Sequence, residues 1–442
     1  MQENLKRDIG PFGLTSAVVN ATVGTGIFTL PALAAENVGS AAIFCFIICG
    51  VLIFLNAFCF AEVGSKITVS GGVYTYIEKA FGPFAGFIAN NLFWFGSCVF
   101  ADAATANALE KIISKFLPWL DSEFVRPLFF LLLFGGLALI NIRGAKHGVR
   151  FVVFATFAKL IPLLLIVGYG FGHISTDNLR LDHFPSLSDI GSSSLILVFA
   201  FFGIETAVTN GGEFKNPART VPLGILSGLI FVLLLYISIQ LITQGVLGNQ
   251  LLANKDFKEA PITAVSQTLF GNVGVTLVIT GTAISMLGLI SGEVLANPRI
   301  LFAGARDGLM PKFLAKVHPR FFTPGRAIIV YTSLGFLIAV CGGFEQLIIL
   351  SSASTLLIYL GVALSTIRLR QKKMPTSQKT FTCPGGITIP LLAAALIIWL
   401  LSNLSKKEMI GILIFIASLS AIYFIMKFIR NKQVSSAATN QA

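Results

Sequence analysis

Residues 11–35 read PFGLTSAVVNATVGTGIFTLPALAA and contain no charged side chain. A helix that crosses a bilayer needs about 20 predominantly apolar residues, so this stretch predicts a membrane span. At its middle, VGTGIF (Val23–Phe28) places two glycines around a threonine, and Pro31 follows shortly after. These residues either serve helix packing alone or interrupt the helix. An interrupted helix exposes backbone N–H and C=O groups at membrane depth, which is tolerated only beside a cavity.

Apolar runs of this kind fill the rest of the sequence. Of 442 residues, 55% are hydrophobic and 12% are charged, whereas a soluble domain carries about 25% charged residues. This composition excludes a soluble globular enzyme and a disordered chain. The runs are continuous and about twice as long as the ten-residue alternating strands of a membrane barrel, so they predict helices. Twelve spans are expected, at 11–35, 40–65, 84–111, 127–142, 150–171, 190–211, 222–247, 274–303, 327–343, 346–367, 387–404 and 408–428.

Lysine and arginine are distributed unevenly over the connections between these spans. The N-terminus and every second connection carry 22 of the 32 Lys and Arg residues, and the opposite connections carry 8. Cytoplasmic loops are enriched in Lys and Arg, so this bias predicts an inner-membrane (plasma membrane) protein with both termini in the cytoplasm. The net charge of +12 is interpreted in the same way and not as a nucleic-acid-binding surface. Residues 1–10 are the expected cytoplasmic N-terminus, and 433–442 are expected to form a disordered tail.

A second interruption is expected in the sixth span. Its sequence FAFFGIET (Phe199–Thr206) again places a glycine at mid-span, now beside the acidic Glu205. Two interrupted spans, five spans apart, are typical of transporters built from inverted repeats. The expected halves are 11–171 and 190–367, and 387–428 supplies two additional helices.

Five ionisable side chains fall within expected spans, and they are Glu62, Asp102, Lys159, Glu205 and Glu293. Charges buried in hydrocarbon are costly, so such residues are functional candidates. Lys159 lies nine residues after Arg150, about 13 Å into a core about 30 Å thick. An amine at this depth either releases its proton, which suits proton coupling, or remains a structural cation paired with a carboxylate. Glu62, near the cytoplasmic end of its span, is expected at the membrane interface.

Three motifs together resemble one known family. They are VGTGIFTLPA in the first span, FAFFGIETA running into GEFKNPARTVP, and NPRILFAGARDGLMPKFLAKVHPRFFTPGRA after the eighth span. In these stretches the chain resembles the permeases of the amino acid–polyamine–organocation family. The resemblance implies an all-α fold of the leucine-transporter type, with a five-plus-five inverted repeat, broken helices 1 and 6, and two further helices.

The resemblance also implies roles for individual residues. Thr25 and Gly26 would receive the substrate carboxylate, and Phe199 would form an aromatic gate or pack in the core. The α-ammonium would meet carbonyl groups near Ala21, Thr22, Phe199 and Phe202. Gly96 and Ser97 would form part of the pocket wall.

A second group of residues concerns coupling and specificity. Lys159 matches the lysine of proton-coupled relatives, with the carbonyl group of Asn20 or Val23 and the hydroxyl of Ser285, or in second place Ser291, as expected neighbours. Glu205 either couples opening to protonation or braces its helix. Glu293 contacts a cationic substrate side chain, pairs with Arg299 or is neutral, and Asp102 is interpreted in a similar way.

Together these patterns predict a secondary amino acid transporter that works by alternating access, with a proton as the coupling ion. A proton-independent exchanger is the alternative within this class, and a channel or a non-transporting sensor is the alternative outside it. No GxxxxGK[ST] phosphate loop occurs, and the histidines and cysteines show no metal-ligand spacing, so neither an enzyme nor a cofactor is expected. The acids favour a cationic substrate and the phenylalanine-rich surroundings favour a neutral one, and the balance is toward a neutral or broad substrate range.

Overall fold

The computed structural model describes residues 9–67, 72–115, 117–143, 148–181, 184–208, 214–306, 310–372 and 380–439. Within these ranges the chain is helical, and its one β-type pairing is the isolated bridge between Ile9 and Phe214. Nine helical segments of the described chain are long and apolar enough to cross a membrane. A tenth span is the bent pair of α1 (Pro11–Thr22) and α2 (Gly26–Glu36).

Two shorter apolar helices, α16 (Gly325–Cys341) and α18 (Thr388–Leu401), occupy the two remaining expected spans. The other spans are formed by α3 (Ala42–Lys66), α5 (Pro83–Asn91) with η2 (Leu92–Val99) and α6 (Phe100–Ser114), α7 (Val125–Arg143), α8 (Gly148–Gly170), α9 (Leu187–Leu197) with η6 (Val198–Phe201) and α10 (Ile204–Ala207), α11 (Pro217–Leu247), α14 (Pro261–Ala296) with α15 (Pro298–Arg306), α17 (Phe344–Gln371) and α19 (Lys406–Thr439). The all-α membrane architecture predicted from the sequence is confirmed.

Short helices lie between the spans. They are η1 (Gly39–Ala41), α4 (Val73–Phe81), η3 (Pro118–Asp121), η4 (Phe171–His173), η5 (Thr176–Leu179), α12 (Gln250–Ala253), α13 (Lys255–Glu259) and η8 (Lys312–Ala315). The α14 helix begins at Pro261, well before the expected start at residue 274, and it changes direction at Gly271, where φ is +64°. Only a residue without a side chain adopts this conformation readily, so Gly271 allows the additional apolar segment to join the span at an angle.

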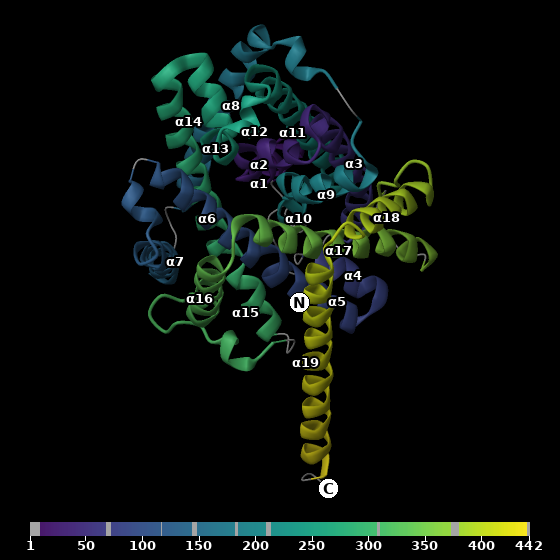
Figure 1. The fold of residues 1–442 in the computed structure, drawn as a ribbon. Helices are drawn as coiled ribbons and strands as arrows, with labels where there is room; N and C mark the ends of the chain where they lie inside the picture. The colour runs from purple at the N-terminus through teal and green to yellow at the C-terminus, as the bar shows by residue number, and fades with distance from the viewer. Residues whose placement is uncertain are drawn as a thin grey trace.

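Both expected helix interruptions are present. The α1 and α2 helices meet at 53° across Val23–Thr25. In the sixth span the helix ends after η6, Phe202 is extended, and Gly203 has a φ of +137° before α10 begins. The interrupted segments α1, α2 and α10 lie in the interior of the bundle, between α8 and α14 on one side and α3 on the other (Figure 1).

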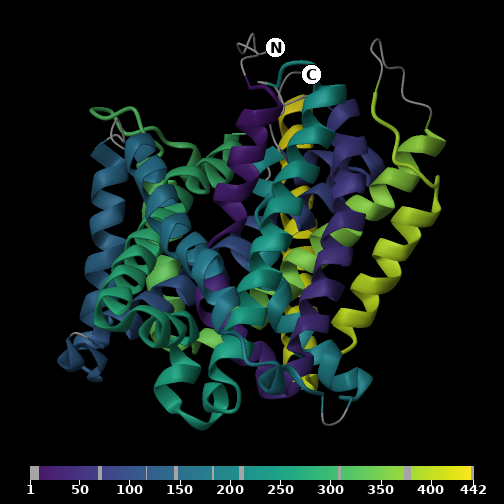
Figure 2. The same cartoon turned by 90° about the horizontal axis from the view of Figure 1, so that it is seen from above.

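The start of α1 and the end of α19 lie at the same end of the bundle (Figure 2). This placement agrees with an even number of spans. The α19 helix continues to Thr439, so residues 433–439 are helical where disorder was expected, and residues 440–442 lie outside the described residues. The segment after Phe428 contains neither Gly nor Pro, so nothing in its sequence ends the helix.

Candidate substrate site

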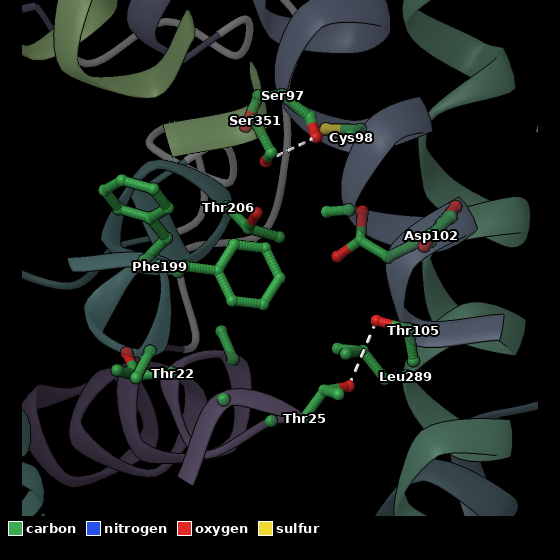
Figure 3. Close-up of a pocket in the computed structure, with 18 of the residues that line it drawn as sticks. Thr22, Thr25, Ser97, Cys98, Asp102, Thr105, Phe199, Thr206, Leu289 and Ser351 are labelled. Atoms are coloured by element: carbon green, nitrogen blue, oxygen red, sulfur yellow. Dashed lines mark hydrogen bonds between the residues drawn. The ribbon is translucent and has the colours of Figure 1, made fainter. Parts of the chain in front are cut away.

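A cavity of about 80 Å³ lies between the two helix interruptions. In Figure 3, Thr22 and Phe199 lie on one side of this pocket, Asp102 and Thr105 lie on the other, and Thr25 closes one end. The pocket is lined by Ala21, Thr22, Gly24, Thr25, Gly26, Ser97, Cys98, Ala101, Asp102, Thr105, Phe199, Ala200, Phe202, Gly203, Glu205, Thr206, Leu289, Glu293 and Ser351. Backbone that has left the helical pattern therefore borders a cavity, as interrupted helices inside a membrane require.

The two interruptions touch each other through glycines. A Cβ atom on Gly203 would lie 2.7 Å from the carbonyl carbon of Ala21 and 2.8 Å from the amide nitrogen of Thr22. A Cβ atom on Gly26 would lie 2.6 Å from the Cα atom of Ala200. Because no side chain fits at either position, glycine is needed for the close approach of the two backbones.

A tyrosine joins the same two backbones from a third helix. The hydroxyl of Tyr236, on α11, donates to the carbonyl oxygen of Thr22 at 2.9 Å and lies 3.0 Å from the carbonyl oxygen of Ala200. Both carbonyl groups lie beside an interruption, where helical partners are missing. Tyr236 is fully buried, so this bridge is shielded from solvent. On the opposite side, the Thr25 hydroxyl donates to the Thr105 hydroxyl at 3.0 Å and ties the first interruption to α6.

Two carboxyl groups in the pocket belong to one hydrogen-bonded chain across three elements. Glu293, on α14, accepts from the amide nitrogen of Asn297 at 2.5 Å, and Asn297 also donates to the hydroxyl oxygen of Tyr331 at 3.0 Å. The Tyr331 hydroxyl, on α16, donates to Oδ2 of Asp102 at 2.7 Å. The expected alternative pairing of Glu293 with Arg299 is not among the ion pairs of the described residues.

The third carboxyl group of the pocket has a different environment. The two carboxylate oxygens of Glu205 accept from the amide of Gly203 at 3.0 and 3.1 Å. Oε2 also accepts from the hydroxyl of Tyr359, on α17, at 2.5 Å. The ring of Tyr359 stands edge-on to that of Phe202, with centroids 5.6 Å apart. Glu205 therefore holds the start of α10 against α17.

Lys159 lies outside the residues that line the pocket but contacts the first interruption. Its side chain is 4% exposed, and its Nζ atom donates to the backbone carbonyl of Asn20 at 2.6 Å. One turn earlier on α8, the Thr156 hydroxyl donates to the side-chain oxygen of Asn20 at 2.5 Å. Of the neighbours expected for Lys159, the described hydrogen bonds include Asn20 and none of Val23, Ser285 and Ser291. No carboxylate of the described residues forms an ion pair with Lys159.

A family model described as amino acid permease matches residues 9–436. The chain belongs to the amino acid permease family. Its relatives include the methylthioribose transporter of Bacillus subtilis (strain 168), at 28% identity over 96% of this chain and 94% of the relative, and the branched-chain amino acid permease BcaP of the same organism, at 26% identity over the same shares. The serine/threonine exchanger SteT, also from Bacillus subtilis, is 28% identical over 88% of this chain and 89% of its own length.

These matches make the chain an integral membrane transporter of amino acids and not an enzyme. The relatives include both permeases and exchangers, so the matches are compatible with symport and with exchange.

The permease pocket contains most of the residues expected from the sequence. Ala21, Thr22, Thr25, Gly26, Ser97, Phe199, Phe202, Glu205 and Glu293 all line it. Gly96 does not, because its Cα atom faces α17, where an added Cβ atom would lie 2.6 Å from the Ser354 hydroxyl oxygen. Gly96 and Ser97 belong to η2, which is a π-helix, and its wider turn changes which side chains face the pocket.

Sequence reasoning missed four residues that organise the permease site. Tyr236, Tyr331, Tyr359 and Asn297 bind the backbone or the carboxyl groups around the pocket. The chain has seven tyrosines; five of them lie inside apolar spans, and these five include the three named here. A polar atom within an apolar span needs a partner, so the rule that selected the acids would also have selected these tyrosines.

Proposed function

We propose that this permease moves an amino acid across the plasma membrane by alternating access, in symport with a proton carried by Lys159. The amino acid would occupy the cavity between the two helix interruptions. The interaction that carries the proposal is the hydrogen bond from the buried Lys159 amine to the Asn20 carbonyl, two residues before the end of α1.

The N-terminus of α2 and the free carbonyl groups of both interruptions suit the two poles of an amino acid. Backbone N–H groups at a helix N-terminus attract a carboxylate, and carbonyl groups without helical partners attract an ammonium. We assign the carboxylate to Thr25 and Gly26, and the ammonium to carbonyl groups near Ala21 and Phe202.

The partners of Lys159 favour coupling over a purely structural role. A permanent buried cation is normally paired with a carboxylate, because burying an unpaired charge is costly. In the described part of the chain, Lys159 instead has a carbonyl partner. Protonation strengthens a hydrogen bond to a carbonyl, so a proton on Lys159 would tighten the contact between α8 and the end of α1. This change biases the equilibrium between conformations of the bundle, to the extent that the two conformations differ in proton affinity.

The test uses purified protein in proteoliposomes and the amino acid that gives the largest thermal shift among the twenty. We expect the wild type to accumulate this amino acid after an acid-outside pH jump and to perform counterflow. Lys159→Ala should lose gradient-driven accumulation and retain counterflow. Lys407→Ala removes an exposed lysine and is the matched control. Intact gradient-driven uptake in Lys159→Ala would refute the coupling role.

The same assay separates the other candidate functions. A proton-independent exchanger performs counterflow in the wild type and does not respond to the pH jump. A channel or a sensor gives no counterflow. The Lys and Arg bias also leads us to propose cytoplasmic termini, which a C-terminal reporter that is active on only one side of the membrane would test.

A further inference from the structure

The pocket is acidic on one side. Asp102 on α6 and Glu293 on α14 face it together with Glu205, and none of the described lining residues is Lys, Arg or His. Glu205 is occupied by the Gly203 amide and the Tyr359 hydroxyl. The acidic character available to a bound molecule therefore comes from Asp102 and Glu293.

Each of these two carboxyl groups has one oxygen held and one oxygen open. Tyr331 donates to Oδ2 of Asp102, and Asn297 donates to Oε2 of Glu293. Neither Oδ1 of Asp102 nor Oε1 of Glu293 has a hydrogen-bond partner among the described residues. Asp102 is 1% exposed, so the open oxygen belongs to a side chain that bulk solvent does not reach.

Buried carboxylates without a positive partner are unstable, so each either takes up a proton or is compensated by a positive charge on a bound molecule. Lys159 does not provide such a charge, because its amine binds the Asn20 carbonyl and it is not among the lining residues. We infer that the compensating charge is carried by the substrate, and that the permease takes amino acids with a cationic ammonium group in the side chain. This inference rests on the proposed function, in which the α-carboxylate and α-ammonium bind the interruptions.

The geometry favours a compact ammonium group. With its backbone at the interruptions, a bound amino acid directs its side chain toward α6 and α14, on the opposite side of the cavity (Figure 3). An ammonium has three donors at one point, and the two open oxygens offer acceptors from two helices. Tyr331 and Asn297 fix the other oxygens, which keeps both acceptors in place before the substrate arrives.

The test compares L-lysine with L-norleucine, which has the same carbon chain without the side-chain amine. Binding to the purified full-length protein is measured by calorimetry, and counterflow by competition. We expect lysine to bind at least about tenfold more tightly than norleucine, the size of effect given by charge-assisted hydrogen bonds. Asp102→Asn and Glu293→Gln should each remove most of this preference.

Glu110→Gln is the matched control. Glu110 is a buried acid on α6, the helix that carries Asp102, and its side chain does not line the pocket. It should retain the lysine preference. Equal or tighter binding of norleucine by the wild type would overturn the inference, even if both acid variants misfold, and would indicate that these acids carry protons. Norleucine counterflow without lysine binding overturns only this inference. Absence of binding and counterflow for every amino acid overturns the proposed function and this inference together.

Discussion

Two of the sites at which the permease buries carboxyl groups have opposite electrostatic environments. At the end of α3, Glu62 is fully buried and accepts hydrogen bonds from Nζ of Lys66 at 2.6 Å, from Nε of Arg370 at 2.7 Å and from the amide of Cys383 at 2.8 Å. In the pocket, Asp102 and Glu293 receive one hydrogen bond each from neutral groups.

The difference separates a structural acid from a binding acid. Glu62, expected at the membrane interface, lies in the last turns of α3, and the structure encloses it between the ends of α3 and α17 and the segment that leads to α18. Two cations compensate its charge, so it needs nothing from outside the protein. The pocket acids lack such cations among the described residues, and they are available to a substrate or to protons. Burial alone therefore does not identify a functional acid, whereas the lack of a positively charged partner for a buried acid does.

The largest effect is expected from Gly203→Ala, which tests the pocket side of this comparison. The new Cβ atom would overlap the Ala21–Thr22 peptide, and alanine is strained at a φ of +137°. We expect a loss of stability of about 3 kcal/mol and loss of counterflow. Gly136→Ala is the control, because a Cβ atom there has no neighbour within 4 Å. Thermal unfolding and counterflow measure both effects, and wild-type transport in Gly203→Ala would contradict the close contact of the two interruptions.

Glu62→Gln tests the other half of the comparison, the buried acid whose charge is balanced by Lys66 and Arg370. Removing the negative charge leaves Arg370 and Lys66 without their shared partner, although both are partly exposed. We expect a loss of about 2 kcal/mol in stability and unchanged substrate affinity. Glu293→Gln should show the reverse, with little loss of stability and altered substrate affinity. Thermal unfolding and substrate binding are measured for both variants. A change of substrate affinity in Glu62→Gln would contradict the assignment of Glu62 as a purely structural acid.

A smaller effect is expected from Tyr236→Phe. The variant keeps the buried ring and removes the hydroxyl that joins the Thr22 and Ala200 carbonyl groups. One lost hydrogen bond to a buried carbonyl corresponds to about 1 kcal/mol, or roughly fivefold in substrate affinity if the bridge shapes the pocket. Tyr423→Phe on α19 is the control. Equal affinities in both variants would show that the bridge does not influence binding.

The smallest effect concerns Cys383, beside Glu62 and outside the spans. Burial, with the nearby Glu62 carboxylate, raises the pKa of the Cys383 thiol to about 11. Only the thiolate reacts with maleimides, so labelling at pH 7.5 should be slow and should increase as the pH rises toward that value. Mass spectrometry of the labelled peptide measures the rate, with unfolded protein as the reference. Labelling of the folded protein as fast as the reference would show that the Glu62 cluster does not enclose this loop.

Much of the fold was predictable because its signals are local. A charge-free run long enough to cross a bilayer forms a helix whatever its neighbours are, since its backbone has to be satisfied within the segment. The interruptions were also predictable, because glycines at mid-span, here Gly24, Gly26 and Gly203, are visible in the sequence and weaken a helix locally. Register inside a span was less predictable: in η2 Ser97 lines the pocket and Gly96 does not, and no residue in its sequence indicates a π-helix.

The sequence by itself therefore determined where the chain crosses the membrane, where two of those crossings are interrupted, and which ionisable residues lie inside them. Only the tertiary structure decided which of these residues are compensated. Glu62 and Arg370 are 308 positions apart, and Lys159 and Asn20 are 139 apart. Electrostatic compensation acts over a few ångströms of space, so it depends on how distant helices pack and not on the order of residues along any one of them.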